Sequence, residues 1–174
     1  MTGEREKVTG KKPGRADPEK GPEGAGAGKD PGVHGPGETW PGAKKGPAEM
    51  TGEQRIEALG ACPFARLLGM EILEARDGYA RVAMDATGKE NFLGVAHGGA
   101  IFALADQAFA AAANRGELLQ VAVSVHIHYL APAKGRLEAV ARLIGETDTY
   151  SHILVEVKSG ERLVATFEGV AYKA

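Results

Sequence analysis

The segment that most constrains the fold is residues 97–115, a long helical pattern that Gly116 ends. Its apolar side chains point to almost every side, at Ile101, Phe102, Leu104, Ala105, Ala108, Phe109, Ala111 and Ala112. A helix without a wide polar face has to be buried on most of its sides. We therefore expect the rest of the domain to wrap around it. The many alanines allow close approach of a sheet, or of a second copy of the helix.

Two strand-like runs precede this helix and four follow it, at residues 70–76, 79–84, 121–130, 136–144, 150–157 and 163–172. The first two are joined by Asp77-Gly78, a strong turn signal. No helical pattern separates the last four, which favours antiparallel pairing. The sequence therefore predicts an α+β fold, in which a curved antiparallel sheet of about six strands wraps around one long helix.

Local patterns add detail to this expectation. Residues 53–59 read as a short amphipathic helix that Gly60 stops, and residues 63–68 as a further helical turn capped by Gly69. In the third strand we expect one apolar, half-buried face. Its members are Val121, Val123, Val125, Ile127 and Tyr129.

The first 49 residues differ in composition from the rest. Of the 9 prolines only Pro63 and Pro132 lie beyond residue 50, and Val8 and Val33 are the only branched aliphatic residues before Met50. Such a segment buries too little apolar surface to offset its ordering entropy. We predict a disordered tail at residues 1–49 and one folded domain at 50–174. Because residues 1–4 are repeated at 50–53, we also hypothesise that translation starts at Met50, which intact-mass measurement tests.

Charge and cysteine content limit the classes of partner and the cellular compartment that we expect for this protein. The 21 basic and 23 acidic residues give a net charge of -2, without the basic excess typical of nucleic-acid binders. Cys62 is the single cysteine, which excludes an intrachain disulfide and fits a reducing cytoplasm. The most apolar run, residues 100–113, is too short to span a bilayer and contains Asp106 and Gln107. We expect a soluble cytoplasmic protein without nucleic-acid or membrane partners.

Asp106 lies in the middle of the apolar helix. An uncompensated buried carboxylate is costly or changes its pKa. One interpretation is a structural aspartate paired with a local donor, and the other is a general base or nucleophile with a tuned pKa. The helix alone does not decide between them.

His97-Gly98-Gly99 stands where this helix begins. Two adjacent glycines are poor helix formers, so they call for a backbone reason. The free N–H groups at a helix N-terminus favour a developing negative charge, as in an oxyanion hole. The alternative is that the glycines only allow a tight turn into the helix.

The spacing of these two features has a consequence. Asp106 follows Gly98 by eight residues, about 12 Å along a helix. One chain therefore cannot apply both groups to the same carbonyl. If both act, the enzyme is a homodimer with active sites shared across its two-fold interface.

Residues 91–106 read NFLGVAHGGAIFALAD, and this motif resembles hotdog-fold thioesterases of the phenylacetic-acid-degradation (PaaI-like) type. The resemblance extends over residues 53–174. It includes Ala108-Phe109-Ala110, Asn114 and Tyr129-Leu130-Ala131-Pro132. It implies the hotdog fold, dimers that often pair into tetramers through their sheets, and hydrolysis of acyl-CoA to free acid and CoA. Aryl-acetyl, short-chain and medium-chain acyl groups are the expected substrates.

The resemblance also implies roles for individual residues. Asp106 matches the catalytic aspartate, as base or nucleophile, and Gly98 the residue whose N–H polarises the thioester carbonyl. His97 and Asn91 match residues that position thioester and water, and no metal or redox cofactor is implied. We interpret three further positions as substrate-binding candidates, namely Gly99, Phe102 and Gln107. Gln107 departs from the family, in which a small hydroxyl residue often follows the aspartate.

Other kinds of functional site have less support in the sequence. His126, His128 and His152 lack an obvious cysteine or acidic co-ligand for zinc, which favours a solvated or interface surface. Lys134 and Arg136 could meet CoA phosphates, although solvated surface charge explains them as well. A non-catalytic acyl-CoA-binding module is the main functional alternative. A hotdog hydratase would place Asp and His together before the helix, and that pattern is not found.

Overall fold

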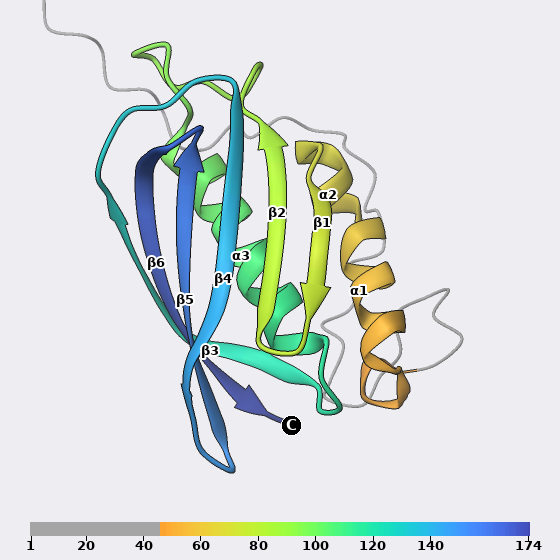
Figure 1. Ribbon diagram of the computed structural model, residues 1–174. Coiled ribbons are helices and arrows are strands. Elements are labelled where there is room, and N and C mark those ends of the chain that lie inside the picture. Colours follow the sequence, from red (N-terminus) through yellow and green to blue (C-terminus); the bar gives the residue numbers. More distant parts are fainter. Residues whose placement is uncertain (1–45) are drawn as a thin grey trace, which may run out of the picture. The chain divides into compact units, whose positions relative to one another are not determined.

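The structure is a computed structural model that describes residues 46–174 (Figure 1). The predicted tail at residues 1–49 lies outside the described residues, except for its last four. Three of those form the 3-10 helix η1, Pro47–Glu49. Within residues 46–174, no helix has the length and apolar character needed to cross a membrane.

Two short helices lead into the sheet, α1 at Gly52–Ala61 and α2 at Pro63–Leu68. Thr51 is the N-cap of α1 and forms a capping box with Gln54. The Thr51 side chain accepts from the Gln54 N–H, and the Gln54 side chain accepts from the Thr51 N–H. The prediction that Gly60 stops the first helix is wrong, because α1 continues to Ala61. Its C-cap is Cys62, which has the extended backbone conformation that a following proline favours. The predicted left-handed cap at Gly69 is confirmed, with φ 61°.

The six strands form one antiparallel sheet in the order β1-β2-β4-β5-β6-β3. Their bounds are Glu71–Arg76, Tyr79–Asp85, Gln120–Tyr129, Arg136–Glu146, Tyr150–Ser159 and Arg162–Lys173, for β1 to β6. The long helix α3, Gly98–Asn114, packs against the sheet (Figure 1). Leu104 and Phe109 of α3 meet Val155 and Phe167 of the sheet in the core. The predicted fold class, a sheet around one long helix, is therefore confirmed.

Strand β3 corrects one prediction. Its pairing with β6 shifts between Ala122 and Ser124, so one extra residue enters the strand there. Directly paired residues share a face. Ile127, opposite buried Phe167, therefore faces α3, whereas Val121, opposite exposed Tyr172, faces outward. The expected single apolar face is wrong because a bulge changes the alternation by one residue.

The same strand is also less buried than expected. It lies at the edge of the sheet, and Val121, Val123 and Val125 remain 49%, 57% and 37% exposed. An edge strand with exposed apolar side chains is a surface on which another chain can pair.

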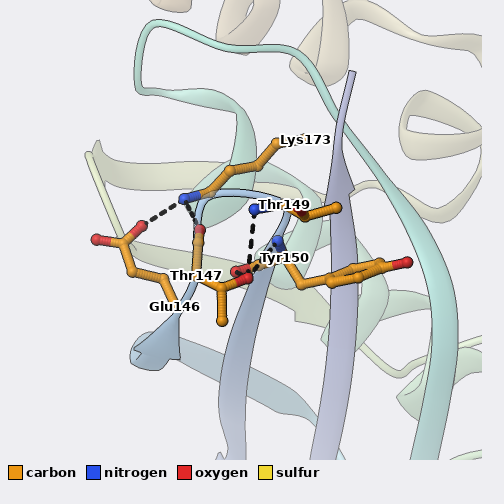
Figure 2. Close-up of polar contacts among 5 residues, drawn as sticks. All are labelled: Glu146, Thr147, Thr149, Tyr150 and Lys173. Atoms are coloured by element: carbon orange, nitrogen blue, oxygen red, sulfur yellow. Dashed lines mark hydrogen bonds and ion pairs between the residues drawn. The ribbon is translucent and has the colours of Figure 1, made fainter.

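The end of β6 fastens the turn between β4 and β5 (Figure 2). Lys173 donates from Nζ to Glu146 Oε2 at 2.8 Å and to the Thr147 carbonyl at 2.7 Å. Inside the turn, Thr147 Oγ1 accepts from the backbone N–H groups of Thr149 and Tyr150. These contacts join three consecutive strands at one corner of the sheet.

Arg55 on α1 holds the end of α3 in place. Its side chain is 3% exposed, and its guanidinium donates to four backbone carbonyls, those of Asn114, Gly116, Glu117 and Met50. A cation at a helix C-terminus also meets the negative end of the helix dipole. Arg55 therefore satisfies carbonyls that would otherwise be left without partners where α3 ends.

We expect Arg55→Met to lower the free energy of unfolding by about 2–3 kcal/mol, because methionine fills the space but leaves these carbonyls unpaired. Urea denaturation at fixed protein concentration measures this. Arg66→Met, the same change at an exposed position of α2, serves as the control. Equal stability of the two variants would contradict the assigned role.

Candidate active site

Asp106 lies on α3 with a half-buried side chain. Within residues 46–174, no hydrogen bond or ion pair to its carboxylate is recorded, and desolvation by burial raises its pKa. The interpretation as a structural aspartate requires a local donor, and the described part of the chain provides none. Among residues 46–174, this carboxylate is thus kept in an apolar setting without a stabilising partner, which is typical of functional carboxylates.

Asp106 belongs to a stripe of half-buried residues on α3, with Phe102 one turn before it and Ala110 one turn after it. The neighbouring helix positions are buried. The Phe102 ring meets the Phe167 ring edge-on at 5.5 Å, so it closes the core beside Asp106. This stripe is the one face of α3 that the described chain leaves partly open.

Gly98 is the first residue of α3, and His97 is its N-cap. No acceptor for the Gly98 N–H is recorded in the described part of the chain, so this donor remains available at the positive end of the helix. A Cβ on Gly98 would lie 3.3 Å from Cζ of Tyr129, so glycine lets the Tyr129 ring approach closely. Both residues line a cleft of about 330 Å³.

Asn91 lines the same cleft as Gly98. Its Oδ1 accepts from the backbone N–H of Leu93 at 2.9 Å and of Val95 at 3.4 Å. Both partners are donors, so the oxygen is the engaged atom of the amide. The Nδ2 group of Asn91 is left to donate to a ligand.

His97 and Gly99 line a neighbouring cleft of about 360 Å³, together with Phe64 and Leu68 of α2. Nδ1 of His97 accepts from the Gly99 N–H at 2.9 Å. A Cβ on Gly99 would lie 3.1 Å from Nδ1, so the second glycine makes room for this ring. Four of the predicted site residues, Asn91, His97, Gly98 and Gly99, therefore lie around the start of α3, in two neighbouring clefts.

Gln107 faces away from this region. It is 9% exposed, and its Nε2 donates to the Leu59 carbonyl of α1 at 2.9 Å. Gln107 thus joins α3 to α1 in this structure, and its amide nitrogen is engaged there rather than beside Asp106.

Asp106 and Gly98 remain apart. Both lie on the uninterrupted helix α3, so about 12 Å of helix separates them. A thioester carbonyl bound at Gly98 is therefore out of reach of Asp106 of the same chain. A site that applies both groups to one carbonyl would require Asp106 from a second chain.

The remaining candidates stay on the surface. In residues 46–174, no group of three or more His, Cys, Asp or Glu is placed to hold a metal ion. The rings of His126 and His128 meet at 4.4 Å, and His152 lies 3.9 Å from Glu168. Lys134 and Arg136 are exposed. Arg136 lies 3.8 Å from Glu71, an ordinary surface ion pair.

One residue at the site was not singled out by the sequence. Tyr129, at the end of β3, donates from its hydroxyl to the Gly98 carbonyl at 3.0 Å. Two sequence signals involve it, the motif Tyr129-Leu130-Ala131-Pro132 and the alternation with Val125 and Ile127, which places it on the face toward α3.

Comparison with known proteins finds relatives of this chain. The family described as Thioesterase superfamily matches residues 93–166. A protein of Archaeoglobus fulgidus, named only in general terms as an esterase, is 40% identical over 111 residues, 62% of this chain and 72% of the relative. Acyl-coenzyme A thioesterase PaaI of Escherichia coli is 34% identical over 113 residues, 63% of this chain and 81% of the relative.

A solved structure shows the same fold. It is an asparagine-to-aspartate mutant of phenylacetic acid degradation protein PaaI from Thermus thermophilus. The two chains superpose with a TM-score of 0.62 at 35% identity, over 65% of this chain and 100% of the other.

Proposed function

Because the chain belongs to the thioesterase superfamily, as a PaaI-like thioester hydrolase with the hotdog fold, we propose that it hydrolyses acyl-CoA to a free acid and CoA. The observation that carries this proposal is the half-buried carboxylate of Asp106, without a recorded partner in residues 46–174. Such a group is prepared to take a proton from water or to attack a carbonyl carbon.

In the proposed reaction, the Gly98 N–H donates to the thioester oxygen and stabilises the negative charge that develops there. As a general base, Asp106 takes a proton from water while the water oxygen bonds to the carbonyl carbon. The tetrahedral intermediate then expels the CoA thiolate, which receives that proton. As a nucleophile, Asp106 would instead attack the carbonyl carbon and expel the CoA thiolate, which gives an acyl-aspartyl anhydride that water hydrolyses. In a single turnover in ¹⁸O-water, ¹⁸O in Asp106 identifies this second route, with water attacking the aspartyl carbonyl of the anhydride. Attack at the acyl carbonyl places ¹⁸O only in the free acid, as the first route does.

We propose supporting roles for three neighbours and no redox cofactor, since hydrolysis transfers no electrons. The proposed reaction also needs no metal, because Asp106 supplies the base or nucleophile and the Gly98 N–H supplies the oxyanion donor. Asn91 lines the cleft of Gly98, and its Nδ2 would donate to the thioester or the water. His97, at the cap of α3, would contact the substrate from the neighbouring cleft. Phe102 beside Asp106 would contact the acyl group.

The active unit in this proposal is a homodimer. The separation of Asp106 and Gly98 on one helix requires two chains, and two-fold symmetry then gives two sites. The half-buried stripe of α3 and the exposed apolar edge of β3 are surfaces that a second copy would cover. We further propose that such dimers pair through the outer faces of their sheets.

Aryl-acetyl-CoA is the first substrate to test, followed by short- and medium-chain acyl-CoAs. The names of the Escherichia coli and Thermus thermophilus relatives support this order. Thiol release with a chromogenic reagent should show turnover of at least one substrate, with kcat/KM of about 10⁴ M⁻¹s⁻¹ or more. Heat-denatured protein gives the background. Calorimetric binding of acyl-CoA without thiol release would instead support the non-catalytic binding module.

The raised pKa of Asp106 predicts the acidic limb of the pH profile. Both routes need the carboxylate, so kcat/KM should fall as pH drops through the pKa of Asp106. Burial raises this pKa, so the inflection should lie above the ordinary value of 3.8, and cover by a partner chain would raise it further. The profile of kcat/KM reports the free enzyme. Constant activity down to about pH 4, with circular dichroism showing folded protein, would contradict the role of Asp106.

A further inference from the structure

Three polar groups stand in series at the start of α3. The Tyr129 hydroxyl donates to the Gly98 carbonyl at 3.0 Å, and the Gly99 N–H donates to Nδ1 of His97 at 2.9 Å. The Gly98 carbonyl and the Gly99 N–H are the two ends of a single peptide group. Tyr129 and His97 are therefore connected through this one peptide.

We propose that Tyr129 is a positioning residue, which acts through the Gly98–Gly99 peptide to hold the His97 imidazole with its proton on Nε2. The inference deepens the proposed thioesterase function, on which its catalytic consequence rests. It assigns His97 the role of a hydrogen-bond donor toward the substrate.

The proton position follows from the direction of the hydrogen bonds. A backbone N–H can only donate, so Nδ1 of His97 must accept and carries no proton. In a neutral imidazole the proton is then on Nε2. Nε2 is the ring nitrogen left for a ligand in the cleft that His97 lines, and it meets that ligand as a donor. His97 in this state is not a proton acceptor for water.

Tyr129 strengthens this arrangement by polarising the peptide. A donor on a carbonyl makes the N–H of the same peptide a better donor, with a cooperative gain of about 10–30% per bond. Burial raises the pKa of the Tyr129 hydroxyl, which keeps it protonated and able to donate. Glycine at position 98 favours the contact, because a Cβ there would lie only 3.3 Å from the Tyr129 ring and the ring would have to shift.

The position of Tyr129 suits a group that fixes geometry. It is the last residue of β3, so a strand of the sheet sets the place of its hydroxyl. His97 is anchored on its other side as well, since its backbone N–H donates to the Lys89 carbonyl at 2.8 Å. The ring thus has one orientation relative to Gly98, whose N–H is the proposed oxyanion donor.

The test is Tyr129→Phe, which removes only the hydroxyl. Tyr150→Phe is the matched control, because Tyr150 is also a half-exposed strand tyrosine, at 46% against 52%. Ring ¹⁵N chemical shifts of ¹⁵N-labelled protein report the tautomer of each neutral histidine. The His97 signals are identified by their loss in His97→Gln. Thiol release gives kcat and KM for the same proteins.

We expect the wild-type His97 ring to be almost wholly in the Nε2–H form. Tyr129→Phe should introduce the Nδ1–H form and lower kcat about two- to tenfold at nearly constant KM, the range for one lost neutral hydrogen bond. Tyr150→Phe should change neither quantity. An unchanged His97 tautomer in Tyr129→Phe overturns the proposal, and so does an altered tautomer with unchanged kcat. If no acyl-CoA is hydrolysed by any of the proteins, the proposed function fails, and the tautomer measurement alone decides the link from Tyr129 to His97.

Discussion

Asp106→Asn is expected to lower kcat about 10³-fold, the typical loss when a positioned base or nucleophile is removed. Asparagine has nearly the same shape but neither takes a proton from water nor attacks a carbonyl. KM should change little, because the carboxylate acts on the reacting carbon and makes no binding contact in the proposed mechanism. Thiol release under saturating acyl-CoA measures the effect.

The free energy of unfolding gives a second test of Asp106, because the asparagine variant should lose activity without losing stability. Burial raises the pKa of Asp106, so the folded protein binds the proton more tightly than the unfolded chain. The carboxylate therefore disfavours the folded state as pH rises above the unfolded value of about 3.8. At neutral pH, Asp106→Asn should be at least as resistant to urea as the wild type. A structural aspartate would show the reverse.

Asp148→Asn is the matched control, the same chemical change at an exposed position between β4 and β5. It should leave both kcat and stability unaltered. Asp106→Asn with wild-type kcat would remove Asp106 from the mechanism. Loss of kcat together with a lower urea midpoint would show instead that the carboxylate maintains the fold.

The fold was largely predictable because two periodic patterns determine it. The apolar character of α3 on all sides required a surrounding sheet, and Asp77-Gly78 and the later turns divided the strands correctly. The predicted strand bounds differ from the observed ones by one or two residues. Length and periodicity are local properties, so the sequence expresses them directly.

Features that depend on tertiary contact were missed. The bulge in β3 is a register property of two strands, and no residue of β3 alone marks it. Gly60 was expected to end α1, but Pro63 sets that boundary. Gln107 lies toward α1, where its Nε2 donates to the Leu59 carbonyl, a contact between two helices that are separate in sequence.

For the candidate site, the sequence named residues but not their arrangement. The motif at residues 91–106 identified Asn91, His97, Gly98 and Asp106. Only the structure shows that Asn91 uses its oxygen within the chain, and that Tyr129 contacts the start of α3. The Tyr129 contact joins segments that are distant in sequence, and a single sequence does not encode its geometry in readable form.

Gly98→Pro is expected to lower kcat about 10²–10³-fold, because proline removes the one backbone N–H assigned to the oxyanion. The backbone should tolerate it. Gly98 is the first residue of α3, where proline is favoured, and His97 already has the extended conformation that precedes proline, with φ -63° and ψ 136°. Within residues 46–174, the Gly98 N–H makes no hydrogen bond that the substitution would remove.

Gly98→Ala is the matched control. It places the same Cβ against the Tyr129 ring, 3.3 Å from Cζ, but keeps the N–H. Any loss of kcat caused by displacing Tyr129 should appear in both variants. The ratio of their kcat values therefore measures the contribution of the Gly98 N–H alone. Equal kcat for the proline and alanine variants would exclude the Gly98 N–H as the oxyanion donor.

The same variant tests whether the site is shared between chains. A mixed dimer of one Gly98→Pro chain and one Asp106→Asn chain is isolated by two different affinity tags. If Asp106 of one chain acts with Gly98 of the other, one of the two sites contains both intact residues, so this dimer should show about half of wild-type activity. If each chain built its own site, every site would carry one defect and the mixed dimer would be as inactive as its parents. The roughly 12 Å between Gly98 and Asp106 along α3 favours the first outcome, because neither residue can move toward the other without breaking the helix that both belong to.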